Sequence, residues 1–286
     1  MLKLLCFLVT LTGCSLKQPD PKVNLPMEEL KAAQEKRIAQ ALSEFDDGLK
    51  RLAPILDDCD GMIWQGQWCS VAGCSLTDYR DDQDPGRFYR RPDPRCWDGK
   101  PQGSATTWSR DMFVCGLLPY ALIRENLEYL KSHQAYGEAH GWYLGEPKAD
   151  GRAYYNPQIR ALLAKAVEHL GGDKDNDALW PTIYPSGLSD YQAHLQVCNI
   201  WARGIIEGKI HSMMLDRVFE HYKRVPDDPF YSVVYAIYSG KTGKAVENCL
   251  KEEPFTGDYV RCGNHGRACG FAHQVFACQI LMDAYD

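Results

Sequence analysis

An arginine and an aspartate stand side by side where an apolar stretch begins, at positions 108–111, Trp-Ser-Arg-Asp. Ser109 suits the cap of a following helix, and Asp111 in the first turn complements the helix dipole. These roles leave Arg110 unexplained, because the stretch that follows is apolar. A guanidinium there suits bidentate binding of a carboxylate or of sugar hydroxyls. A structural ion pair between Arg110 and Asp111 is an equally good interpretation.

A tyrosine and a histidine precede a second apolar stretch, at positions 189–194, Ser-Asp-Tyr-Gln-Ala-His. A lone histidine in the first turn of such a helix is more commonly a hydrogen-bonded core residue than a base. With Tyr191 beside it, His194 could instead share the abstraction of a proton from a sugar ring. His194 is therefore a candidate catalytic residue, and Tyr191 a candidate substrate-binding residue.

Three aspartates crowd into positions 57–64, Asp-Asp-Cys-Asp-Gly-Met-Ile-Trp. If these carboxylates are buried they cannot all ionise freely, so Asp60 could hold a raised pKa and act as an acid. The simpler interpretation is a solvated turn that pivots on Gly61, and this segment alone favours it. Trp64 offers an aromatic face for a sugar ring, and Arg87, in Gly-Arg-Phe-Tyr-Arg-Arg-Pro at 86–92, offers a charge to orient it.

The start of the chain has the pattern of an exported lipoprotein. Lys3 gives a positive start, and the apolar run that follows is too short to span a bilayer as a helix. Leu-Thr-Gly-Cys at 11–14 resembles the bacterial lipobox, which implies cleavage before Cys14 and acylation of that cysteine. We expect a signal peptide over 1–13, a proline-containing lipidated tether over 14–26, and one helical domain over 27–286. Ser15 favours the outer membrane over the inner one.

Ten of the twelve cysteines remain after Cys6 is removed and Cys14 is acylated. An exported chain with an even number of cysteines is expected to form disulfides, and we expect at least two. Cys115, Cys198 and Cys278 fall in apolar helical stretches, where a buried free thiol is ordinary. The candidates for bridges are Cys59, Cys69, Cys74 and Cys96 in one cluster, and Cys249, Cys262 and Cys269 in another.

Zinc is a weaker interpretation of the last cysteine cluster. Two cysteines and two histidines within twelve residues could form a tetrahedral site. Export favours disulfides instead, and the spacing is uncommon for zinc. We therefore assign no metal ligand and no cofactor from the sequence. The four residues concerned are Cys262, His265, Cys269 and His273.

The elements that must position these residues are helical. Apolar residues recur at steps of three and four, and no stretch alternates as a strand would. Residues 57–107 lack periodicity and predict a long structured loop, with at most a helical turn at Met62–Trp68. The result is an all-α class, an array of α/α hairpins that forms an incomplete toroid with long disulfide-bearing loops. The expected helices are Met27–Ala53, Asp111–Leu130, Pro157–Leu170, Gln192–Glu207, Ser212–Tyr222, Pro229–Ser239 and Gly270–Ala284.

Several segments resemble an uncharacterised family of bacterial and phage proteins over about residues 57–210. The shared motifs are a D-G-x-x-W start, a G-R-x-x-R-R-P step, an S-R-D-M helix start and an H-L helix. The layout is similar to that of α/α-toroid carbohydrate-active enzymes, an analogy of fold that proves no activity. The extra cysteines and the lipobox suggest adaptation to an oxidising, exported setting. The resemblance implies a pocket that contains Asp60, Trp64, Arg87, Arg110, Asp111 and His194.

Two functions fit these observations. The first is a membrane-tethered hydrolase or lyase that acts on a glycan. A hydrolase would use Asp60 and Asp111 as its two carboxylates. A lyase would use His194 or Tyr191 as a base near a uronate held by Arg110. The second is a non-catalytic envelope lipoprotein, of bacterial or phage origin, that binds a glycan or a receptor. A net charge of −6 gives no support to nucleic-acid binding. Clustering of Asp60, Arg110, Asp111 and His194 around one cleft would favour the enzyme.

Overall fold

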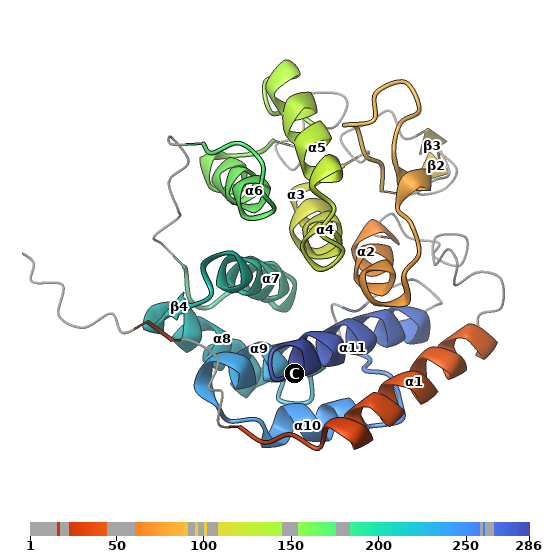
Figure 1. The fold of residues 1–286 in the computed structure, drawn as a ribbon, viewed down its shortest axis with the longest axis vertical. Helices are drawn as coiled ribbons and strands as arrows, with labels where there is room; N and C mark the ends of the chain where they lie inside the picture. Colours follow the sequence, from red (N-terminus) through yellow and green to blue (C-terminus); the bar gives the residue numbers. More distant parts are fainter. Residues whose placement is uncertain are drawn as a thin grey trace, which may run out of the picture.

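The computed structural model describes residues 16–17, 23–44, 61–90, 95–96, 100–101, 108–144, 154–175, 184–257, 260 and 266–286. This part of the chain is mainly helical, with strands of only two residues each (Figure 1), which confirms the all-α class. Within these ranges, no helix is both long enough and apolar enough to cross a membrane. The toroid-like curvature of the array stays a prediction.

The helices pack as an inner and an outer group (Figure 1). The inner group is α2 (Gly61–Ala72), α3 (Arg110–Met112), η4 (Phe113–Leu117), α4 (Leu118–Ile123), α7 (Asp190–Glu207), α9 (Pro229–Ser239) and α11 (Gly266–Asp283). The outer group is α1 (Met27–Glu44), α5 (Leu127–Ala139), α6 (Pro157–His169), α8 (Ser212–Arg224) and α10 (Gly243–Leu250). One continuous cluster of buried apolar side chains forms the core, and its members range along the chain from Leu25 to Met282.

The outer helices show why periodicity predicted them. α8 turns Met214, Val218 and His221 inward at steps of four and three, and its other faces are mostly polar, apart from the exposed side chains of Met213 and Phe219. α6 begins at Pro157, because the first turn of a helix tolerates proline. The Asn156 side chain caps the helix by accepting a hydrogen bond from the Ile159 amide. The bounds of α6, α7, α8, α9 and α11 lie within four residues of those predicted. Of the predicted Met27–Ala53 helix, the described part ends at Glu44.

The predicted loop over 57–107 is wrong at residues 61–72, where Gly61–Ala72 forms the helix α2; the short turn expected at Met62–Trp68 lies inside this longer helix. Every residue from Gly61 to Ser70 is buried. A helix that packs on all sides has no polar stripe, so its sequence has no 3.6-residue pattern to recognise. Cys69 in the last turn of this helix forms a disulfide with Cys74, which lies between α2 and η3 (Thr77–Tyr79).

The predicted helix Asp111–Leu130 is interrupted. It begins as α3, widens into the π-helical turn η4, continues as α4 and ends before Glu125, which adopts a left-handed backbone with φ of 51°. α5 then starts at Leu127, capped by the Asn126 side chain. The short helix α10 was not predicted, because its eight residues are too few for a clear period.

Two short antiparallel pairs complete the described part of the chain. β2 (Arg95–Cys96) pairs with β3 (Lys100–Pro101). β1 (Leu16–Lys17) pairs with β4 (Ile210–His211), the strand between α7 and α8. The segment predicted to be a free tether therefore lies partly on the domain, and Leu25 at its end is buried. Cys14 and the predicted signal peptide lie outside the described residues.

Candidate functional site: a buried thiol–imidazole centre and a neighbouring pocket

Cys115 lies in the middle of η4, a wide helical turn of a kind that is rare in proteins and frequent at functional sites. α2 packs tightly on this turn: a Cβ atom on Gly66 would lie 2.3 Å from the carbonyl oxygen of Gly116. Gln67 in α2 donates a hydrogen bond of 3.3 Å from Nε2 to the carbonyl oxygen of Cys115. The glycine contact and this bond together fix the backbone at Cys115.

α7 provides two further groups. A capping box between Ser189 and Gln192 fixes the start of this helix. His194 and Cys198 follow, four residues apart and therefore on the same face. The Nε2 atom of His194 lies 3.5 Å from the Sγ atom of Cys198.

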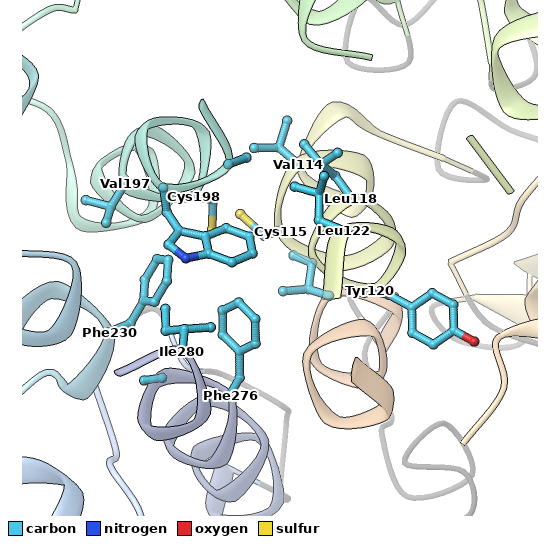
Figure 2. Packing of buried hydrophobic residues seen from close by; sticks show 14 of the residues in the cluster. Val114, Cys115, Leu118, Tyr120, Leu122, Val197, Cys198, Phe230, Phe276 and Ile280 are labelled. Atoms are coloured by element: carbon cyan, nitrogen blue, oxygen red, sulfur yellow. The ribbon is translucent and has the colours of Figure 1, made fainter. Parts of the chain in front are cut away.

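The Cys115 thiol meets this pair from the opposite helix. The sulfur atoms of Cys115 and Cys198 and a ring nitrogen of His194 all lie within 4.8 Å of one another. Figure 2 shows the two sulfur atoms facing each other from α7 and the η4–α4 segment. All three side chains are at most 1% exposed. We refer to Cys115, His194 and Cys198 as the thiol–imidazole centre.

The groups of this centre change one another's protonation. Burial raises the pKa of the Cys198 thiol, but a hydrogen bond with Cys115 and the charge of His194 outweigh burial, and the pKa falls to about 6. Burial lowers the pKa of His194, but its interaction with Cys198 reverses this and raises the pKa. Burial and the hydrogen bond to Cys198 raise the pKa of Cys115 well above its usual value. Cys198 and His194 thus favour a thiolate–imidazolium pair, the state in which cysteine acts as a nucleophile or a metal ligand.

A second buried histidine lies beside the centre. The ring centroid of His273 on α11 lies 5.5 Å from that of His194. Nε2 of His273 is 3.3 Å from Oδ1 of Asp228, and its Nδ1 is 3.3 Å from Oε1 of Gln67. Burial lowers the pKa of His273, against the opposing charge of Asp228. The interior of the helical array therefore contains a connected set of polar side chains and not only apolar packing.

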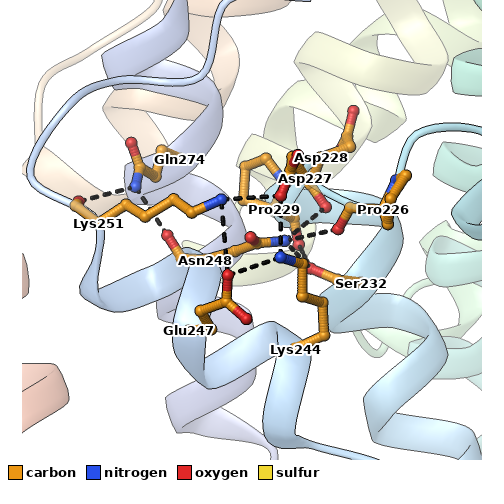
Figure 3. Close-up of polar contacts among 10 residues, drawn as sticks. All are labelled: Pro226, Asp227, Asp228, Pro229, Ser232, Lys244, Glu247, Asn248, Lys251 and Gln274. Atoms are coloured by element: carbon orange, nitrogen blue, oxygen red, sulfur yellow. Dashed lines mark hydrogen bonds and ion pairs between the residues drawn. The ribbon is translucent and has the colours of Figure 1, made fainter.

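Asp228 is held in place from two directions. Its carboxylate accepts a hydrogen bond from the Tyr231 amide and so caps α9. Figure 3 shows the contacts on the other side, where Asn248 of α10 donates to the Pro226 carbonyl oxygen at 2.9 Å and to Ser232 at 3.0 Å. α10 thus fixes the turn that presents Asp228 to the interior.

Trp64 and Asp111 also lie close to the thiol–imidazole centre. The indole of Trp64 stacks on the His194 ring with centroids 5.8 Å apart, and it meets His273 edge-on at 5.7 Å. Asp111 is buried, bonded to the Ser109 hydroxyl, and its charge acts on both His194 and Cys115. Of the residues predicted to share a pocket, Trp64, Asp111 and His194 therefore lie together in the interior.

A pocket of about 360 Å³ opens on another face of α7. We refer to it as the α7 pocket. Within the described ranges its lining contains one guanidinium, four amides and a phenol, and no carboxylate. The lining residues are Arg110, Val114, Asn156, Gln158, Ile159, Tyr184, Pro185, Leu188, Leu195, Gln196 and Asn199.

Two polar groups of the α7 pocket are unsatisfied. Oδ1 of Asn199 is buried without a hydrogen-bond partner. Arg110 forms no ion pair with Asp111, which bonds to Ser109 instead, and no hydrogen bond or ion pair holds its guanidinium within the described part of the chain. Three other polar side chains of the lining are occupied: Asn156 accepts from the Ile159 amide, Tyr184 accepts from Arg203, and Gln196 donates to the Pro185 carbonyl oxygen at 3.0 Å. The pocket thus offers a free cation and a free acceptor to a ligand.

The remaining predicted site residues lie elsewhere. Arg87 lies 3.8 Å from Asp81 and over the ring of Tyr89, away from the α7 pocket lining. Tyr191 is 38% exposed in the first turn of α7 and does not line the pocket. Asp60 lies outside the described residues. The structure therefore does not gather the predicted residues around one open cleft among the residues it describes.

The disulfides explain which thiols are free. Cys69 pairs with Cys74, and Cys249 of α10 pairs with Cys278 of α11. The interpretation of Cys278 as a free thiol is therefore wrong; its partner lies 29 positions earlier and only the packing of α10 on α11 brings the two together. Cys269 is also in a disulfide, which removes it as a zinc ligand. Cys59, Cys262 and His265 lie outside the described residues. Cys115 and Cys198 are free and buried, as the sequence predicted.

No pattern in the sequence predicted that these two thiols lie close together. Cys115 and His194 are 79 positions apart, and only the contact between η4 and α7 unites them. The one local signal was the spacing of His194 and Cys198, four residues apart on a helix, which places two ligating atoms on one face. Against known proteins, no family model, no curated protein and no solved structure matches this chain. The family resemblance therefore stays a prediction.

Proposed function

We propose that this chain is an exported, lipid-anchored protein that binds a glycan carrying carboxylate groups, such as a uronate, in the α7 pocket. The observation that supports the proposal best is the free guanidinium of Arg110 in a pocket otherwise lined by amides and apolar groups. A guanidinium recognises a carboxylate by paired, charge-assisted hydrogen bonds. Amides such as Asn199 accept from and donate to hydroxyls, while Val114 and Leu195 contact the apolar faces of a sugar ring.

Binding is favoured over hydrolysis by the composition of the pocket. Glycoside hydrolysis usually needs two carboxylates that flank the bond to be cleaved. None lines the described pocket, and Asp111 bonds to Ser109 in the interior. A lyase would need a base at the ligand, and neither His194 nor Tyr191 lines the pocket. The hydrolase or lyase interpretation stays a prediction that depends on residues such as Asp60.

The anchoring part of the proposal rests on the lipobox at Cys14. Two or three acyl chains hold a protein stably on a membrane. The pairing of Leu16–Lys17 with β4 fits this arrangement, because it joins the chain next to Cys14 directly to the end of α7. A lipid on Cys14 would keep the domain close to the membrane surface, where envelope glycans are found.

A binding screen tests the ligand assignment. Full chain in detergent micelles is titrated against neutral and uronate-bearing oligosaccharides, with the variants Arg110→Ala and Arg87→Ala. Loss of a charged hydrogen bond costs about 1.5–3 kcal/mol, so Arg110→Ala should weaken uronate binding roughly tenfold or more. Arg87→Ala is the matched control, because it removes a surface arginine that already contacts Asp81. Equal binding by wild type and Arg110→Ala would contradict the proposal.

A further inference from the structure

We propose that Cys115, His194 and Cys198 form a binding site for one soft divalent transition-metal ion, zinc in the first instance. The ligands are the two sulfur atoms and Nε2 of the imidazole. This site is separate from the α7 pocket, and the inference does not depend on the proposed glycan binding.

The spacing of the ligating atoms matches a tetrahedral zinc site. Zinc–sulfur bonds of about 2.3 Å and zinc–nitrogen bonds of about 2.05 Å, set at the tetrahedral angle, place sulfur and nitrogen roughly 3.6 Å apart. The Sγ atom of Cys198 lies 3.5 Å from Nε2 of His194. The Cys115 sulfur completes a triangle with every edge within 4.8 Å. Side-chain adjustments of less than about one ångström would therefore bring all three atoms to bonding distance.

The backbone on both sides supports this geometry. His194 and Cys198 sit one turn apart on a capped helix, so their relative position is fixed. Cys115 sits in a π-helical turn that the Gly66–Gly116 contact holds against α2. A site on rigid helices keeps its ligands in place without the metal, which is what selective binding requires.

Charge and chemistry also favour zinc over a harder cation. Thiolates and imidazole are ligands that zinc prefers, whereas magnesium and calcium prefer oxygen. Two thiolates and one dication sum to zero net charge, so the filled centre adds no unpaired charge to an interior where these side chains are at most 1% exposed.

The surroundings leave room for a fourth ligand. Three protein ligands are the number found in zinc sites that also bind a water or a substrate. Trp64 stacks on the His194 ring, and its buried Nε1–H has no hydrogen-bond partner in the described structure. A water or small anion on the metal next to the indole would give this donor a partner. His273 lies next to His194, but Asp228 and Gln67 engage its two ring nitrogens, which leaves the fourth position to a water or a small anion.

Metal content is measured on the full chain, purified in detergent under conditions that keep free thiols reduced and exposed to Zn²⁺ alone. We expect one zinc per chain after dialysis, and less than about a tenth of that in Cys115→Ser and in Cys198→Ser. The double variant Cys69→Ser with Cys74→Ser is the matched control and should keep its zinc, because it removes a cysteine pair outside the centre.

Cobalt gives a readout that does not depend on the variants folding. Replacing zinc by Co²⁺ in the wild-type chain should produce a thiolate-to-cobalt charge-transfer band and the strong visible bands of a tetrahedral ion. Absence of stoichiometric zinc together with absence of these bands would overturn the proposal. So would a Cys115–Cys198 disulfide in freshly isolated protein, or full metal binding by the Cys198→Ser variant.

Discussion

His133 should make the stability of this protein fall steeply between neutral and mildly acidic pH. The side chain is 0% exposed on α5. Its Nδ1 donates to the Gly86 carbonyl oxygen at 2.9 Å, since a carbonyl can only accept, and its Nε2 accepts from the Tyr155 hydroxyl at 2.9 Å. That hydroxyl accepts in turn from Trp108 Nε1. A proton on Nε2 would break this chain of bonds, so the folded state requires the neutral ring.

The size of the effect follows from the pKa of His133. Burial lowers this pKa from 6.5 to about 4, against the smaller effect of the bond to Gly86. Below about pH 6.5 the unfolded chain binds a proton that the folded chain does not, so stability falls as the pH falls until about pH 4. The difference between a pKa of 6.5 in the unfolded chain and about 4 in the folded chain corresponds to about 3 kcal/mol of stability. Above pH 6.5 the group has no effect.

Urea unfolding at pH 7 and pH 4 measures this contribution. The free energy of unfolding of wild type should drop by about 3 kcal/mol more than that of His133→Gln over this range. His169→Gln, which removes an exposed histidine at the end of α6, is the control and should follow wild type. Nuclear magnetic resonance of the wild type should show the His133 ring still neutral at pH 5. Equal pH dependence in His133→Gln and wild type, or a protonated ring at pH 5, would refute the argument.

Three further changes test the fold and the anchor. Cys249→Ala with Cys278→Ala opens a loop of 29 positions and should cost roughly 3–4 kcal/mol in urea unfolding; a loss below about 1 kcal/mol would argue against the bridge. Gly66→Ala places a Cβ atom 2.3 Å from a backbone oxygen and should cost about 3 kcal/mol, whereas Gly243→Ala, with nothing within 4 Å, should be neutral or slightly stabilising. Cys14→Ser should abolish palmitate labelling and release the chain from membranes, and unchanged labelling would exclude the lipobox.

The sequence predicted the elements that obey a simple period. α8 and α9 begin at the predicted residues, Ser212 and Pro229. An apolar stripe indicates α8, and a proline in the first turn indicates α9. α2 was not predicted, because a helix that is buried on all faces has no apolar stripe to set it apart from a polar face. The π-helical turn at Phe113–Leu117 was not predicted, because nothing local distinguishes it from an α-helical turn. The break after Ile123 was not predicted either, because it depends on the left-handed backbone of Glu125, a non-glycine residue.

The site was harder to predict than the fold, for a physical reason. Trp64 and His194 were recognised as unusual from their neighbours, and they do meet, but in the interior and not on a cleft. Cys115 and Cys198 seemed ordinary because a buried thiol in an apolar helix is ordinary. Only tertiary packing shows that these two thiols share one imidazole, and single-sequence patterns contain no information about such contacts.

Amide hydrogen exchange in the presence of a uronate-bearing oligosaccharide tests the proposed binding site most directly. If the α7 pocket is the ligand site, added oligosaccharide should slow exchange at Tyr184–Leu188, at the start of α6 and along Leu195–Asn199, which line it from three sides. Exchange around Arg87 should not change. Protection confined to the Arg87 segment, or no protection at saturating oligosaccharide, would contradict the assignment of the α7 pocket as the glycan site.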